Sequence, residues 1–317
     1  MEFSRRKFSA LLAGSLTLPL LKIAPATAAE KVVRMGYQKY GTLVLLKGKG
    51  LLEQKLGKIG YTVSWKEFPA GPQLLEALNV GAIDFGTTGE TPPIFAQAAG
   101  APLVYVAHEP PAPLGEAILV AKDSPIKSVA ELKGKTVVLN KGSNVHFLLV
   151  KALEEAGLKY SDIKTSFLPP ADARAAFERG AVDAWVIWDP FQAAAEVAIE
   201  ARELRNGDGI VPNHQFYLST KSFVADHPQA VDIVLEAVGE IDEWAKTNTS
   251  AAAAELAPSV GIPEDVLAIA LKRQSYGVKT LDAAVVTQQQ AIADTFFELG
   301  LIPSKISIAD VVRKGGA

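Results

Sequence analysis

The feature that most constrains the fold is an alternation of short β-branched segments with segments of helical spacing. Residues 31–37 (KVVRMGY) are rich in β-branched side chains, and residues 61–68 (YTVSWKEF) alternate at period two, as strands do. Further strands are expected at 82–87 and 103–107, with helices at 43–56, 73–79 and 91–99. This order predicts an α/β fold in which a parallel or mixed sheet is flanked by helices.

A proline-rich segment, Pro110-Pro111-Ala112-Pro113, divides this series from a second one. The second series has expected strands at 116–122, 135–139, 182–188 and 216–218, and helices at 145–156, 171–179, 229–244 and 283–297. We therefore predict two lobes joined by two hinge crossings, near 114–116 and 214–218. Lobe 1 is expected to comprise residues 30–114 and 219–317, and lobe 2 residues 115–218 including the hinge strands.

The first 29 residues have the pattern of an export signal. Arg5 and Arg6 precede an apolar run over 10–21, which is too short to span a bilayer, and the small residues 26–29 (ATAA) follow. The paired arginines are typical of the bacterial twin-arginine signal. An amphipathic helix is the alternative. We predict cleavage near Ala29 and a periplasmic protein with no lipid anchor, since the chain has no cysteine to carry one.

The composition excludes several classes of chemistry. With no cysteine, the chain forms no disulfide, zinc–thiolate site or iron–sulfur cluster and has no cysteine nucleophile. A net charge of −3 gives no electrostatic reason to expect a nucleic acid partner. The four histidines lack metal-ligand spacing, and no nucleophile elbow, Walker A loop or G-x-G-x-x-G is present. We expect no catalytic residues, no metal and no cofactor.

Four junctions between an expected strand and the following helix carry glycine together with hydroxyl or amide side chains. Helix N-termini present unpaired N–H groups that favour anions, and in open α/β sheets ligands bind beyond the carboxyl ends of the strands. The alternative is that these residues only cap their helices. The candidate ligand contacts at these junctions are Gln38, Gly41, Thr42, Gly71, Thr88, Gly89, Glu90, Thr91, Gly142, Ser143 and Asn144.

The segment WVIWDPF, residues 185–191, ends an expected strand and supplies two more candidates. Alternation along the strand places Trp185 and Trp188 on opposite faces. We expect Trp185 in the core, Trp188 as a wall of the cleft, and Asp189 either as a ligand group or as the cap of the next helix. His146, in the first turn of an expected helix, could line the cleft or be structural.

Across residues 36–100, 131–158 (ELKGKTVVLNKGSNVHFLLVKALEEAGL) and 183–194 (DAWVIWDPFQAA), the chain resembles the periplasmic substrate-binding proteins of ABC importers for aliphatic sulfonates. The resemblance implies a two-lobed, type II periplasmic binding protein that is a monomer and delivers its ligand to a membrane permease. Nitrate, bicarbonate, taurine and pyrimidine-precursor binders are similar as well. Enzymes that resemble this fold rely on cysteine, so the resemblance implies no enzyme here.

The choice of anion follows from the charges at the junctions. Lys39 and Lys141 are the nearby cations, and Glu90 stands among the neutral donors. A sulfonate is a monoanion without a proton, whereas a phosphate monoester carries nearly two charges at pH 7, and Glu90 would repel the second. We expect Glu90 to cap its helix or to link to a neighbouring loop, and the alternative is a role beside the ammonium of an amino-sulfonate. We expect small alkyl sulfonates to bind better than phosphate esters.

Overall fold

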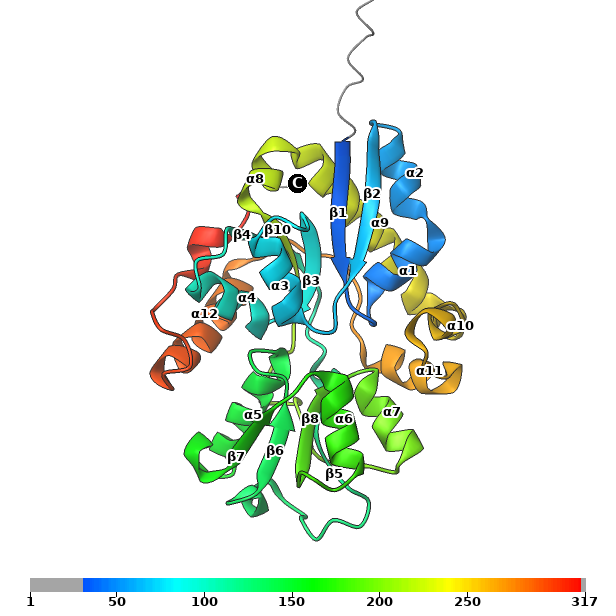
Figure 1. Ribbon diagram of the computed structural model, residues 1–317. Helices are drawn as coiled ribbons and strands as arrows, with labels where there is room; N and C mark the ends of the chain where they lie inside the picture. The colour runs from blue at the N-terminus through cyan, green and yellow to red at the C-terminus, as the bar shows by residue number, and fades with distance from the viewer. Residues whose placement is uncertain (1–30, 315–317) are drawn as a thin grey trace, which may run out of the picture. The chain divides into compact units, whose positions relative to one another are not determined.

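The computed structural model describes residues 31–314, which contain two mixed sheets (Figure 1). In the first sheet the strand order is β2-β1-β3-β10-β4. The strand β1 is parallel to β2 and β3, and β10 is antiparallel to β3 and β4. The bounds are β1 Lys31–Tyr37, β2 Tyr61–Glu67, β3 Phe85–Gly89, β4 Leu103–His108 and β10 Gln215–Thr220.

The second sheet has the order β7-β6-β8-β5-β9. Its strand β6 is parallel to β7 and β8, and β5 is antiparallel to β8 and β9. The bounds are β5 Glu116–Val120, β6 Thr136–Leu139, β7 Lys164–Phe167, β8 Ala184–Trp188 and β9 Arg202–Asn206. The predicted class, α/β with mixed sheets flanked by helices, is confirmed.

Helices flank both sheets in Figure 1. With the first sheet lie α1 Thr42–Lys49, α2 Leu51–Gly57, α3 Gly71–Asn79, α4 Thr91–Ala98, α8 Lys221–Asp226, α9 Pro228–Thr247, α10 Thr249–Val260, α11 Glu264–Arg273 and α12 Ala283–Glu298. With the second lie α5 Asn144–Glu155, α6 Pro170–Glu178 and α7 Phe191–Ala198. Short 3-10 turns are η1 Pro113–Gly115, η2 Val129–Leu132, η3 Tyr160–Asp162 and η4 Ile308–Val311.

The chain passes from one sheet to the other after β4 and returns before β10, and the two connections run side by side. The Glu109 N–H donates to the Gln215 carbonyl at 2.9 Å, and the Ala112 N–H donates to the Pro212 carbonyl at 3.0 Å. All of β10 hydrogen-bonds within the first sheet. Residues 215–218, which the sequence-based division placed with lobe 2, are therefore strand residues of the first sheet.

Glycine backbones account for two differences from the expected elements. The single helix predicted over 43–56 is two helices, because Gly50 adopts the left-handed conformation (φ 62°) between α1 and α2. The strand predicted from residue 82 begins only at Phe85, because Gly81 (φ 68°) and the following residues close the end of α3. The Ala82 N–H donates there to the Ala77 carbonyl at 2.8 Å.

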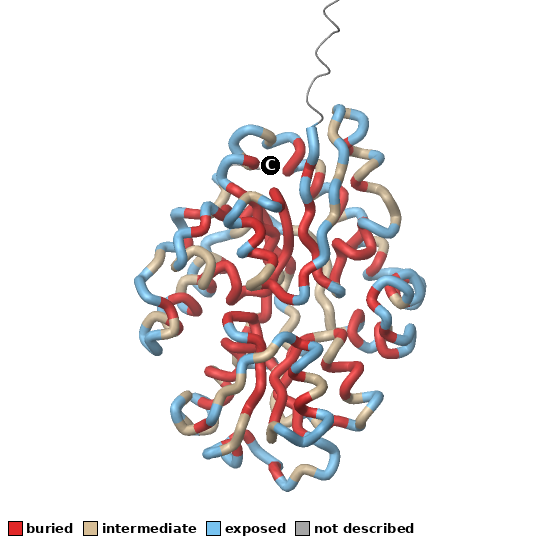
Figure 2. Tube along the Cα trace, in the orientation of Figure 1, coloured by how far each residue is buried: buried red, intermediate tan, exposed pale blue. Residues whose placement is uncertain are grey.

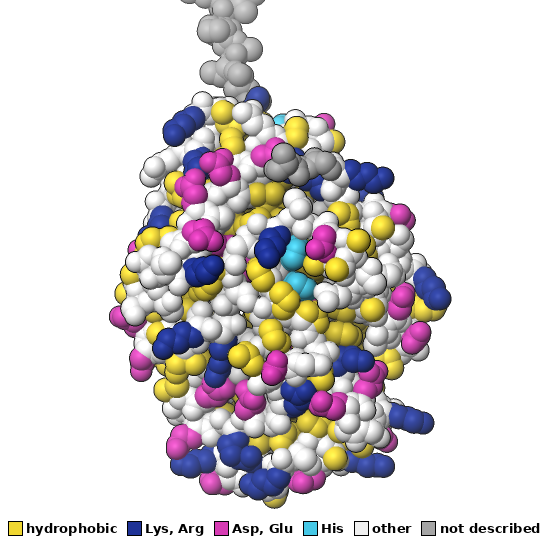
Figure 3. Space-filling model, turned by 180° about the vertical axis from the view of Figure 1, so that it is seen from behind, with side chains coloured by type: hydrophobic (Ala, Val, Ile, Leu, Met, Phe, Trp, Pro, Cys, Tyr) yellow, Lys and Arg dark blue, Asp and Glu magenta, His cyan; other side chains and the backbone are white. Residues whose placement is uncertain are grey.

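The strands β3, β4, β5 and β8 are buried throughout, whereas β2, β7 and β9 are partly exposed, as are the outward faces of the helices (Figure 2). Trp185 is fully buried beside Phe177, as expected of a core residue. Over residues 31–314 no helix combines the length and apolarity needed to cross a membrane. On the face drawn in Figure 3, basic and acidic side chains are intermixed, and neither sign forms a large patch.

Candidate ligand-binding site

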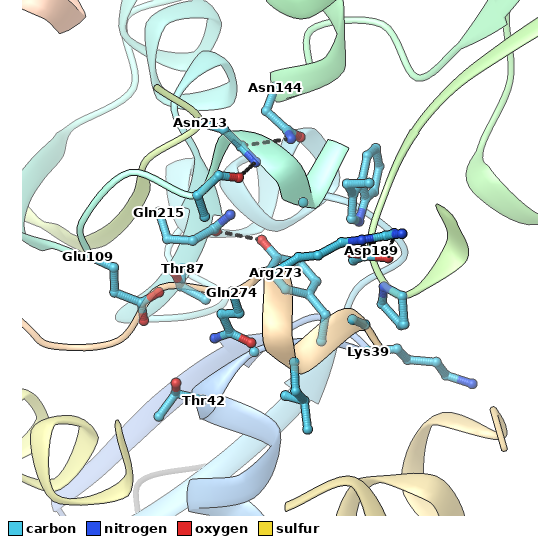
Figure 4. A pocket seen from close by; sticks show the side chains of 18 of the residues that line it. Lys39, Thr42, Thr87, Glu109, Asn144, Asp189, Asn213, Gln215, Arg273 and Gln274 are labelled. Atoms are coloured by element: carbon cyan, nitrogen blue, oxygen red, sulfur yellow. Dashed lines mark hydrogen bonds and ion pairs between the residues drawn. The ribbon is translucent and has the colours of Figure 1, made fainter. Parts of the chain in front are cut away.

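A cavity of about 720 Å³, part of it open to solvent, is lined by residues from both sheets and from both connections. Its walls comprise the segment after β1, residues of β3 and β10, the start of α5, the end of β8, and the facing sides of α10 and α11 (Figure 4).

The polar wall is built around the N-terminus of α1. Gly41 (φ 76°) and Thr42 line the cavity at this helix start, where the first N–H groups have no partner within the helix. The Thr42 hydroxyl donates to the Asp242 carboxylate. Nearby, the Tyr40 hydroxyl donates to Gln215 Oε1 at 2.7 Å, and both residues face the cavity. Because both hydroxyls donate their protons within the protein, the donors that this wall offers a ligand are the helix-end N–H groups and the side-chain amide of Gln215.

Another part of the cavity lining is apolar. Leu256 on α10 and Leu267, Ala270 and Leu271 on α11 form it, together with Trp188 at the end of β8. The Trp188 ring packs edge-on against Phe191, and its Nε1 has no hydrogen-bond partner among the described residues. Such a surface suits the hydrocarbon part of a ligand.

The charged side chains of the cavity come from different elements. Arg273 at the end of α11 lies 3.5 Å from the Asp189 carboxylate and 2.6 Å from Glu196. Burial raises the pKa of Asp189 to about 6, although the charge of Arg273 opposes this rise. Asp189 also accepts from the Ala193 N–H at 3.0 Å, which is the expected helix cap. Lys39, which is largely exposed, lies 3.8 Å from Glu67.

Glu109 is the second acid of the cavity, and it is 3% exposed. Its carboxylate accepts a hydrogen bond from the Tyr217 hydroxyl. Burial, and then the charge of Asp242, raise the pKa of Glu109 well above the usual range.

Five of the predicted site residues line this cavity: Gly41, Thr42, Asn144, Trp188 and Asp189. Asn144 is held by its neighbours, because its Nδ2 donates to Glu116 and, at 3.1 Å, to Asn213 Oδ1. The Asn213 side chain in turn donates to the Ala112 carbonyl at 2.9 Å. The start of α5 is thereby tied to both connections.

The other candidates of the first lobe do not line this cavity. Gln38 Nε2 donates to the Thr87 carbonyl at 3.1 Å. A Cβ on Gly71 would stand 2.7 Å from Pro92 and 3.1 Å from Thr88, so this glycine allows α3 and α4 to pack closely. The Thr88 hydroxyl donates to the Gly89 carbonyl at 2.9 Å, and the buried Thr91 hydroxyl has no hydrogen-bond partner within residues 31–314.

Glu90 is fully buried and faces the connection before β10 rather than the cavity. Its Oε2 accepts from the His214 N–H at 3.1 Å, and its Oε1 has no partner among the described residues. Burial raises the pKa of Glu90 to about 8. The neighbouring Glu116 is also fully buried, and burial together with the charge of Glu90 raises its pKa well above the usual range.

The second-lobe candidates before and within α5 are engaged in structural contacts. The Ser143 hydroxyl donates to the Asn140 carbonyl at 2.7 Å, and Gly142 (φ 73°) donates its N–H to His146 Nδ1 at 3.3 Å. His146 packs among Phe95, Phe167 and Phe296, and its Nε2 lies 2.8 Å from the Tyr160 hydroxyl. Burial lowers the pKa of His146 to about 4. None of these three residues lines the cavity.

Sequence reasoning missed the residues contributed by the connections and by the C-terminal helices. Glu109 and Asn213 stand in irregular segments, and Arg273 ends an ordinary amphipathic helix. The available signal was the pair of crossings, since residues flanking a hinge necessarily lie near the cleft. Across the described part of the chain, no three His, Asp or Glu side chains are placed to hold a metal ion.

A cavity between two α/β lobes joined by two adjacent connections defines a type II, two-lobed binding protein. Residues 62–252 match the family model described as NMT1/THI5 like. The chain is 46% identical over 299 residues to the putative aliphatic sulfonates-binding protein of Escherichia coli K12, which covers 94% of this chain and 93% of that protein.

Two solved structures agree with this match. The alkanesulfonate-binding protein SsuA of Xanthomonas axonopodis pv. citri, bound to MOPS, has a TM-score of 0.87 and 42% identity over 91% of this chain and 100% of that one. The periplasmic aliphatic sulphonate-binding protein SsuA of Escherichia coli has a TM-score of 0.82 and 45% identity over 90% and 93%. The chain therefore belongs to the NMT1/THI5-like family and, within it, to the aliphatic sulfonate-binding proteins.

Proposed function

We propose that the protein binds a small organic sulfonate in this cavity and delivers it to the membrane permease of an ABC importer. The observation that carries the proposal is the pairing of the α1 N-terminus with an apolar wall in one cavity, in a chain 46% identical to a putative aliphatic sulfonates-binding protein. A sulfonate head and its hydrocarbon tail match these two walls.

In the proposed pose the sulfonate oxygens accept from the free N–H groups at the start of α1 and from nearby neutral donors. A helix N-terminus stabilises a single negative charge without a buried counter-ion, so it avoids much of the desolvation cost of an ion pair. The tail lies against Leu267 and Leu271 of α11 and against Trp188. The alternative candidates, nitrate and bicarbonate, would leave this apolar wall without a partner.

A phosphate ester fits this site less well than a sulfonate. It carries close to two charges at pH 7, and the cavity contains the acids Glu109 and Asp189. Of the cations that line the cavity, Arg273 is already engaged by Asp189 and Glu196, and Lys39 lies 3.8 Å from Glu67. We therefore expect selection for the singly charged head group.

We also propose that the two lobes move about the paired connections, because a ligand that contacts both lobes favours the closed state. Lobe 1 then comprises residues 30–114 and the segment from β10 onward, and lobe 2 the residues between. The protein acts as a monomer in the periplasm, after cleavage near Ala29 of the predicted signal peptide. That peptide lies outside the described residues.

The proposal is tested by titrating propane-1-sulfonate and propyl phosphate into the purified protein by calorimetry. We expect the sulfonate to bind at least tenfold more tightly, and a preference for the phosphate would contradict the assignment. The variant Leu271→Asn places a polar group on the apolar wall and should weaken sulfonate binding about tenfold or more. Ile269→Asn, at a more exposed position of the same helix, is the matched control and should leave affinity unchanged.

A further inference from the structure

Hydrogen bonds to its neighbours hold the backbone of Glu109, whose side chain lines the cavity. Glu109 directly follows β4, and its N–H donates to the Gln215 carbonyl at 2.9 Å. Its own carbonyl accepts from the Nδ1 atoms of His108 at 2.9 Å and of His214 at 2.8 Å. In Figure 4 the carboxylate points toward Thr87, Thr42 and Gln274 rather than away from them.

No cation among the described residues neutralises the Glu109 carboxylate. Within residues 31–314 no Lys, Arg or His forms an ion pair with Glu109. One carboxylate oxygen, Oε1, accepts from the Tyr217 hydroxyl, and the described residues supply no donor to Oε2. Asp189, which also lines the cavity, differs from Glu109 because it has Arg273 as an ion-pair partner.

A second carboxylate increases the negative charge at this end of the cavity. Asp242 on α9 accepts from the Thr42 hydroxyl and, at 2.9 Å, from the Gly277 N–H. It also lacks an ion-pair partner among the described residues, and its charge acts directly on Glu109. Glu109 is 3% exposed and Asp242 is 0% exposed. Because neither has a cationic partner among the described residues, burying both in their charged form is costly.

We propose that Glu109 is the counter-ion for a protonated amine of the ligand, so that the preferred ligands are small zwitterionic amino-sulfonates. The inference rests on the proposed function, since it places a sulfonate at the start of α1 in the same cavity. The ammonium of the ligand supplies the cation that the protein lacks, and its N–H groups reach the free Oε2. Glu90, the acid that the sequence suggested for this role, faces His214 and does not line the cavity. We therefore assign the role to Glu109.

A competing arrangement would use Glu109 as a neutral acid that donates its proton to a sulfonate oxygen. The two arrangements differ in their response to pH. A counter-ion must be ionised, so binding of the amino-sulfonate strengthens as pH rises through the raised pKa of Glu109, and it releases a proton wherever free Glu109 is protonated. A neutral donor gives the reverse dependence.

The experiment compares two ligands of equal length, 2-aminoethanesulfonate and propane-1-sulfonate, which differ by an ammonium in place of a methyl group. Calorimetry on the wild-type protein at pH 7.5 should show at least about tenfold tighter binding of the amino-sulfonate. In Glu109→Gln, which keeps the shape and removes the charge, this preference should fall at least about tenfold. Binding of propane-1-sulfonate should not weaken, because the charge that is removed does not attract its sulfonate.

Glu116→Gln is the matched control, because Glu116 is a buried carboxyl that does not line the cavity. It should leave the ratio of the two affinities unchanged. Equal or tighter binding of propane-1-sulfonate by the wild-type protein would overturn the inference while the proposed function stands, and this result needs no variant. Failure of both ligands to bind would overturn the proposed function and the inference with it.

Discussion

Gly89 lies so close to Asn144 that a Cβ placed on the glycine would stand 2.8 Å from the Asn144 Cβ. Gly89 ends β3 in the first sheet, and Asn144 begins α5 beside the second. Because Cβ atoms do not approach a carbon this closely, the two lobes can touch here only if residue 89 has no side chain. Gly89, which the sequence predicted to be a ligand contact, thus limits how closely the two lobes can approach each other.

We predict that Gly89→Ala disfavours the closed arrangement. The added methyl overlaps Asn144, and relieving such overlap costs roughly 1–3 kcal/mol. Sulfonate affinity should fall about tenfold or more, and small-angle scattering of the ligand-saturated variant should give a larger radius of gyration than that of the wild type. Gly239→Ala is the control, since nothing lies within 4 Å of its Cβ position in α9. Wild-type affinity in Gly89→Ala would show that the lobes do not close on this contact.

The sequence predicts those strands whose own residues show a β-branched or apolar pattern. The core strands β1, β5, β6 and β8 have β-branched or apolar sequences and were expected near their observed bounds. The edge strands β7 (KTSF) and β9 (RELRN) were missed. Each is an edge strand with a neighbouring strand on one side, and its residues are largely polar. Neither an apolar alternation nor a long β-branched run therefore identifies β7 or β9 in the sequence.

The candidate site was predicted in part for a related reason. Gly41, Thr42 and Trp188 follow strands, and the ends of parallel strands meet at one edge of a sheet. Glu109 and Arg273 reach the cavity through the pairing of the two connections and the packing of α11 against α7. Such placement depends on contacts between distant segments, which no local pattern records.

We predict that Arg273→Met destabilises the protein and weakens ligand binding. Arg273 neutralises Asp189 and Glu196, whose side chains are 11% and 20% exposed, and its loss leaves two carboxylates uncompensated. Removing one partner of a buried pair costs about 3–5 kcal/mol, and partial exposure reduces this to about 1–3 kcal/mol. Urea unfolding at pH 7 measures the change.

The matched variant is Arg205→Met, which breaks the pair with Glu155, a side chain 49% exposed. Exposed pairs contribute little, so its free energy of unfolding should stay within about 1 kcal/mol of wild type. Equal losses in the two arginine variants would show that Arg273 contributes packing rather than charge.

We predict that Glu90→Gln flattens the pH dependence of stability. Burial raises the folded-state pKa of Glu90 from 4.5 to about 8, so between these values the folded state binds more protons than the unfolded state. The contribution of Glu90 to stability is therefore full below pH 4.5 and declines as pH rises to about 8. At pH 8 the variant should be at least about 1 kcal/mol more stable than wild type.

Urea unfolding at pH 5, 6, 7 and 8 provides this measurement. Removing the charge of Glu90 also relieves Glu116, whose pKa that charge raises, so the slope should flatten further. Glu76→Gln on the exposed side of α3 is the control and should retain the wild-type slope. A variant as steep as wild type would mean that Glu90 is already charged in the folded protein.

The last prediction is that His146 stays neutral in the folded protein and takes no part in binding. Its Nδ1 accepts from the Gly142 N–H, so Nε2 carries the proton toward the Tyr160 hydroxyl, and a second proton would oppose the Gly142 N–H. Burial lowers its pKa from 6.5 to about 4; the unfolded state therefore takes up the proton first, and stability is lost as pH falls from 6.5 toward 4. The Cε1 proton resonance of His146 should remain constant between pH 5.5 and 8, whereas in urea-unfolded protein it titrates near 6.5. His146→Phe should reduce the loss of stability below pH 6.5 and leave sulfonate affinity within about threefold, since the ring does not line the cavity. A resonance that titrates near pH 6, or a tenfold loss of affinity, would return His146 to the ligand site.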